Sequence, residues 1–154
     1  MKTKSNDMML PKGITGFWSV KTGAPPFLDE REFRRMCHTL ARKSDGAVTE
    51  IDTNTAARNF YLAGLSRFGQ SVFLLQNIHY SYAAFAQRDT SGRFVLTQRP
   101  EWLQLPEIPV RFLSIAELNQ DWRGLCGELG PEELEQIRYW NPKTVGEIIF
   151  NAWD

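Results

Sequence analysis

The middle of the chain alternates short segments rich in β-branched, aliphatic and aromatic residues with glycine-containing turn motifs. Segments of this composition favour β-strands. The turn motifs Arg67-Phe68-Gly69-Gln70 and Asp89-Thr90-Ser91-Gly92 are short enough to close hairpins. Since consecutive strands joined by short turns pair antiparallel, the pattern predicts an antiparallel sheet. The expected strands are Ile14–Val20, Ala47–Asp52, Asn59–Ser66, Ser71–Tyr80, Tyr82–Gln87, Arg93–Thr97 and, at an edge that tolerates Pro109, Ile108–Leu113.

A helix is expected after Asp29, a favourable N-cap residue with Glu32 three positions on. The apolar residues Phe33, Met36, Cys37 and Leu40 follow at i, i+3, i+4 and i+7, the spacing of one helical face. The motif Ser44-Asp45-Gly46 is expected to end this helix.

The last third of the chain carries helix-start motifs instead. Ser114 with Glu117 forms a capping-box pattern, Gly130-Pro131 suits the first turn of a helix, and Thr144 with Glu147 repeats the capping pattern. An apolar stripe over 145–153 should dock on the sheet. The sequence therefore predicts an α+β fold: an antiparallel sheet of four to six strands with one early helix and a C-terminal helical cluster. We expect a single domain over residues 1–154, with 1–10 frayed.

Composition bounds the function classes. The start of the chain lacks the pattern of a secretory leader and no stretch is long enough to span a bilayer, so we expect a cytoplasmic protein that does not bind a membrane. In that compartment the two cysteines, Cys37 and Cys126, should be free thiols. Arg31, Arg35 and Arg42 share a helical face, but the chain has a formal net charge of zero, and we expect no nucleic-acid binding. The oligomeric state stays open.

No motif for a phosphate, cofactor, metal or nucleophile site is present, so we expect no catalytic residue, no cofactor and no metal. Cys37 and His38 are neighbours on a helix and would not face each other. Two alternatives to a pure binding protein stay open. One is a small hydrolase built around His79. The other is a module that binds a small ligand or peptide through Tyr80, Tyr82 and Phe85.

Charge is distributed unevenly along the chain. Residues 1–100 contain 14 Lys and Arg against 8 Asp and Glu, whereas residues 101–154 contain 4 against 10. Two interpretations stay open. The two halves of the chain pack against each other and the acidic residues form an ordinary solvated helix surface, or the acidic residues, which mix with aromatic ones, form an interface with a basic protein. The predicted partner-binding residues are Glu117, Asp121, Trp122, Glu128, Glu132, Glu133 and Glu135.

Two segments resemble a known class of proteins. Residues 10–18, LPKGITGFW, and residues 139–154, YWNPKTVGEIIFNAWD, are similar to segments of small bacterial immunity proteins of polymorphic-toxin and contact-dependent growth inhibition systems. The resemblance implies a cytoplasmic protein that binds one cognate toxin domain and blocks it, without catalytic residues. Many such toxins are basic nucleases, which the acidic segment would suit.

Overall fold

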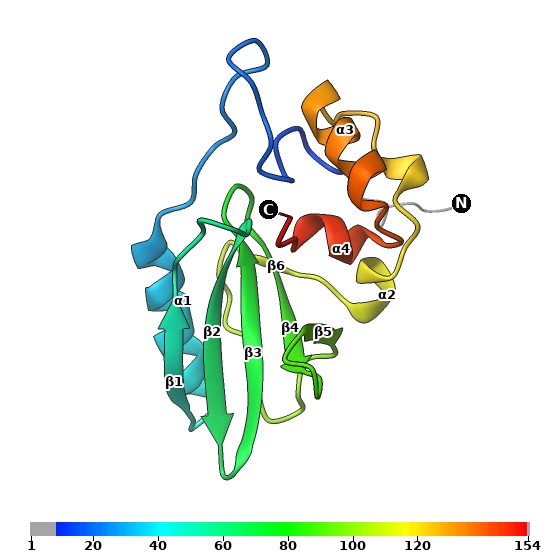
Figure 1. Cartoon of the computed structure of the whole chain (residues 1–154). Coiled ribbons are helices and arrows are strands. Elements are labelled where there is room, and N and C mark those ends of the chain that lie inside the picture. Colours follow the sequence, from blue (N-terminus) through cyan, green and yellow to red (C-terminus); the bar gives the residue numbers. More distant parts are fainter. Residues whose placement is uncertain (1–8, 154) are drawn as a thin grey trace, which may run out of the picture.

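The centre of the fold is a six-stranded sheet in the computed structural model, which describes residues 9–153 (Figure 1). The strands are β1 (Ala47–Asp52), β2 (Phe60–Arg67), β3 (Gln70–Asn77), β4 (Tyr82–Arg88), β5 (Phe94–Thr97) and β6 (Arg111–Phe112). The first five lie side by side in sequence order and pair antiparallel. The predicted α+β class and both predicted hairpins are confirmed.

The sixth strand departs from the antiparallel pattern. Arg111 and Phe112 pair with Tyr82 and Ala83 in parallel, beside the part of β4 that β5 leaves free. The strand is shorter than the predicted Ile108–Leu113, since Pro109 has no amide hydrogen to contribute to a ladder.

Helix α1 (Glu30–Lys43) covers one face of the sheet. Asp29 caps it by accepting a hydrogen bond from the Arg31 amide, and its buried face packs on β2, β3 and β4. Each large side chain buried there contributes about 1.5–3 kcal/mol. Burial also raises the pKa of the Cys37 thiol to about 12, so that side chain stays a neutral part of the core.

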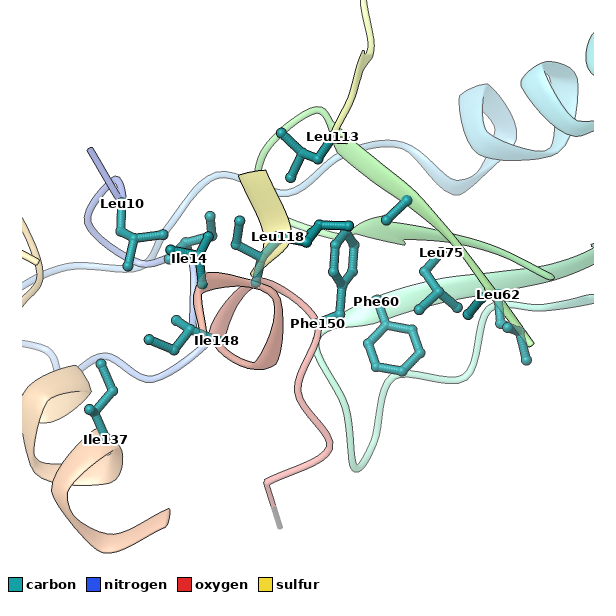
Figure 2. Packing of buried hydrophobic residues seen from close by; sticks show 14 of the residues in the cluster. Leu10, Ile14, Phe60, Leu62, Leu75, Leu113, Leu118, Ile137, Ile148 and Phe150 are labelled. Carbon is teal, nitrogen blue, oxygen red and sulfur yellow. The ribbon is translucent and has the colours of Figure 1, made fainter. Parts of the chain in front are cut away.

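The C-terminal helical cluster packs against one end of the opposite face of the sheet, away from the turn between β2 and β3 (Figure 1). The cluster consists of α2 (Ile115–Leu118), the short 3-10 helix η1 (Arg123–Leu125), α3 (Pro131–Trp140) and α4 (Val145–Ile149). Its Leu118, Ile148 and Phe150 meet the sheet residues Phe60 and Leu75 in a second core, as Figure 2 shows. The predicted docking of the C-terminal apolar stripe is therefore confirmed.

The predicted strand Ile14–Val20 is wrong. This segment forms turns, because Gly13 and Gly16 adopt φ angles of +92° and +90°, a region closed to a strand. A side chain at Gly13 would also collide with Pro25. The predicted fraying fails at Leu10, which is fully buried and donates its amide to the Leu125 carbonyl. Residues 1–8 of that prediction lie outside the described chain.

Candidate functional site

A buried carboxylate joins the N-terminal turn to helix α3. Oε1 of Glu133 accepts the backbone amides of Gly13 at 2.8 Å and Gly130 at 3.0 Å. Oε2 accepts the amide of Thr15 at 3.0 Å and its hydroxyl at 2.6 Å. Glu133 is only 1% exposed, so these four donors replace the water that its charge would otherwise require.

Three buried asparagines extend this connection to the end of the chain. Asn59 and Asn77 both donate to the carbonyl of Ile14. The side chain of Asn151 donates to the carbonyl of Thr15, and the backbone amide of Asn151 donates to the side-chain oxygen of Asn59. The network therefore holds together the two segments on which the immunity-protein resemblance rests, although they lie at opposite ends of the sequence.

A cavity of about 330 Å³ opens beside this network. Its walls come from the N-terminal turn, the segment before β2, the end of β3 and the C-terminal residues. The aromatic side chains lining it are Phe17, Trp18, Phe27 and Trp153, and its polar lining includes Arg58, Asn59, His79 and Asn151. Such a mixture of apolar walls and a few polar groups is typical of binding sites.

His79 is the titratable group most deeply set in the cavity wall. The side chain is 3% exposed, its Nδ1 lies 2.8 Å from the carbonyl oxygen of Pro26, and Phe27 packs edge-on at 4.7 Å between ring centroids. Burial lowers the pKa of His79, against the opposing effects of the Pro26 hydrogen bond and the charge of Glu133.

The lowered pKa of His79 predicts a pH-dependent stability. Between its folded pKa and the unfolded value near 6.5, the unfolded chain binds a proton that the folded chain does not, so stability falls as pH falls through this window. Urea unfolding at about pH 7.5 and 5.5 should show a smaller loss for His79→Asn than for the unmodified chain. The exposed His38 gives the control His38→Asn, which should lose as much stability between the two pH values as the unmodified chain.

An equal loss of unfolding free energy in all three proteins would contradict a lowered pKa of His79 as the cause.

Aromatic side chains continue from the cavity onto the outer surface. Phe17 stacks with Trp153, Trp153 stacks parallel to Trp140 at 6.2 Å, and Trp140 contacts Tyr139 edge-on. Exposed fractions of 46% for Trp18, 66% for Phe27 and 78% for Tyr139 leave much of these rings in solvent. We call this set the aromatic surface; its members are Phe17, Trp18, Phe27, Tyr139, Trp140 and Trp153. Exposed apolar groups gathered in one place mark interaction sites more often than isolated ones do.

The predicted acidic residues do not form one uniform patch. Glu133 is internal, so its side chain is not available to a partner. Glu117 caps α2 and pairs with Arg111, and Asp121 pairs with Arg123 at 2.6 Å. Trp122 is half-buried against the core and donates to the Pro142 carbonyl.

Three of the predicted residues keep accessible charge. Glu128 and Glu135 are exposed and form no ion pair within residues 9–153. Glu132 is half-buried, and Thr22 donates to it. On α3, Glu132, Glu135 and Tyr139 follow at i, i+3 and i+7, so these two carboxylates border the aromatic surface.

His79 and the pair of Cys37 and His38 are the two groups of the sequence analysis with possible catalytic side chains. Among the described residues no carboxylate is hydrogen-bonded to His79, and Cys37 is buried whereas His38 is exposed.

Two of the residues considered for a ligand-binding module, Tyr82 and Phe85, do not share a surface. Tyr82 packs with the C-terminal core and Phe85 packs with α1. Three positions apart on a strand, their side chains point to opposite faces.

Within residues 9–153, no three His, Cys, Asp or Glu side chains gather as a metal site would require. No helix in this part of the chain combines the length and apolar character needed to cross a membrane. Comparisons with protein-family models, curated proteins and solved structures gave no significant match.

Proposed function

We propose that this chain is an immunity protein that binds a cognate toxin domain in the cytoplasm and blocks it. The single observation that carries the proposal is the aromatic surface. All of its members except Phe27 come from residues 10–18 and 139–154. The rings of Trp18 and Phe27 line the cavity, and those of Trp140 and Tyr139 continue outward from Trp153 in its wall, so that four substantially exposed rings lie on one connected surface.

Aromatic side chains are the commonest anchors of protein interfaces, because they bury a large area at a small cost in side-chain entropy. Here the anchors are also pre-positioned. The network centred on Glu133 and Asn151 fixes the backbone of both segments, so little ordering is left to binding.

Charge supports a basic partner. Glu132 and Glu135 carry negative charge on α3 beside the aromatic surface, and Glu128 is exposed shortly before that helix. Glu117 and Asp121 are paired with arginines instead. A basic toxin domain, such as a nuclease, would meet a negative border around an apolar centre.

The test is direct binding to the toxin domain encoded next to this gene. We expect a one-to-one complex with a dissociation constant in about the nanomolar range and loss of toxin activity in the complex. Absence of binding at micromolar concentrations, or a neighbourhood without any toxin gene together with no co-purifying protein, would refute the proposal.

A further inference from the structure

We propose that the cavity beside His79 receives one tyrosine or tryptophan side chain of the partner, whose O–H or N–H group donates a hydrogen bond to Nε2 of His79. The proposal rests on the proposed function and adds to it the chemistry of the central contact. Its test uses small probes, so that it can fail independently of the search for the toxin.

The contacts of the ring determine which nitrogen can accept. A carbonyl oxygen only accepts hydrogen bonds, so the contact of 2.8 Å with Pro26 requires the proton on Nδ1 in the neutral ring. Nε2 is then left with a lone pair. It has no hydrogen-bond partner among residues 9–153, although the side chain is 97% withdrawn from solvent.

Glycine keeps space open at this nitrogen. Nε2 lies beside Gly16, which lines the same cavity, and a β-carbon on Gly16 would come to 3.5 Å from Nε2. A β-carbon there would be in van der Waals contact with Nε2, whereas glycine leaves that side of the acceptor open to the cavity. Nε2 has no protein partner within residues 9–153, and a donor arriving with the ligand would supply one.

The surrounding groups select a neutral guest with an aromatic body. Arg58 lines the cavity, so a cation would meet its positive charge, while the lone pair of Nε2 would repel an anion. The guanidinium itself is engaged by Asp52 at 3.1 Å and by the Phe60 carbonyl, which withdraws it as a competing donor. The walls supplied by Phe17, Phe27 and Trp153 suit offset or edge-on ring packing.

The position of the cavity favours a side chain of a protein over a free metabolite. Its volume of about 330 Å³ has room for one aromatic ring. The cavity is also continuous with the stacked rings of Trp153 and Trp140, so a guest entering it would sit at the centre of the aromatic surface.

The experiment compares two probes that differ in one group. 4-Methylphenol carries the hydroxyl donor of tyrosine, and toluene has nearly the same shape without a donor. Both are titrated into the full isotope-labelled chain while NMR follows the Nε2 resonance of His79 and the amides of Gly16 and Trp153. We expect roughly millimolar binding, with 4-methylphenol binding about three- to tenfold more tightly and moving the Nε2 resonance.

Two substitutions separate the acceptor from the fold. His79→Asn keeps an amide donor near the position of Nδ1 for Pro26 and removes the atom at Nε2, so the preference for 4-methylphenol should disappear. His79→Gln returns an acceptor oxygen near Nε2 and should restore part of the preference for 4-methylphenol, and His38→Asn should leave that preference unchanged.

Equal affinity for both probes, no shift of the His79 resonances, or a preference that survives in His79→Asn would overturn the proposal. Any of these results would leave toxin binding by the aromatic surface standing, whereas failure to bind the toxin with the probe preference intact would count against the proposed function alone.

Discussion

Replacing Glu133 with glutamine is expected to lower the free energy of unfolding by about 3 kcal/mol or more. The carboxylate accepts four hydrogen bonds, two on each oxygen, from donors that are themselves buried. An amide offers a single accepting oxygen. If its NH2 group replaces Oε1, the amides of Gly13 and Gly130 lose their acceptor, and if it replaces Oε2, the amide of Thr15 does. At least one buried backbone donor is therefore left unsatisfied in either orientation.

The comparison needs a glutamate on the same helix that makes no such contacts. Glu135 is exposed, and Glu135→Gln should change stability by no more than about 0.5 kcal/mol. Urea unfolding of the two variants and the unmodified chain measures the difference. If both substitutions lower the free energy of unfolding equally, the hydrogen bonds of Glu133 do not hold the N-terminal turn to α3.

Helix α1 and the strands could be predicted because the information that forms them is local. Asp29 and the apolar spacing of Phe33 to Leu40 lie within one segment, and the hairpin turn at Phe68 and Gly69 is closed by its immediate neighbours Arg67 and Gln70. Local patterns of this kind specify the same element in almost any tertiary context.

The site could not be predicted in the same way, because its contacts join residues far apart in sequence. Thr15 and Glu133 are separated by 118 positions, and nothing near Thr15 indicates that its amide will bind a carboxylate rather than a neighbouring strand. The predicted strand at Ile14 failed at the positive φ angles of Gly13 and Gly16, and the amides turned away from a sheet there bind Glu133 instead. Counting charges along the sequence likewise grouped Glu133 with exposed Glu135, although one is a structural acceptor and the other a surface charge.

The two segments of the resemblance, residues 10–18 and 139–154, supply most of the aromatic surface. Its members from these segments are Phe17, Trp18, Tyr139, Trp140 and Trp153. The predicted partner-binding set contained none of them, because stacking between Trp140 and Trp153 depends on how α3 meets the C-terminus. An aromatic-rich composition at both chain ends was the one available indication.

Replacing Trp140 with alanine is expected to weaken toxin binding by about 2 kcal/mol or more, which is at least about 30-fold. The ring stacks on Trp153 at 6.2 Å and donates to Gln136, so it is held in one orientation before a partner arrives. Its removal deletes contact area and also frees Trp153. Because 39% of Trp140 is exposed, the free chain should lose much less stability than the complex loses affinity.

A matched control is available at the other end of the sheet, in the turn between β2 and β3 (Figure 1). Phe68 is 83% exposed there, and Phe68→Ala should leave toxin binding unchanged, as measured by calorimetric titration of each variant. The double charge reversal Glu132→Lys with Glu135→Lys tests the acidic border, and surface plasmon resonance on the same variants separates the two rates. If charge steers association and the rings hold the complex, the reversal slows association whereas Trp140→Ala speeds dissociation. Full affinity in Trp140→Ala with a large loss in the charge-reversed chain would place the binding energy on the acidic residues of α3 and remove the aromatic surface from the interface.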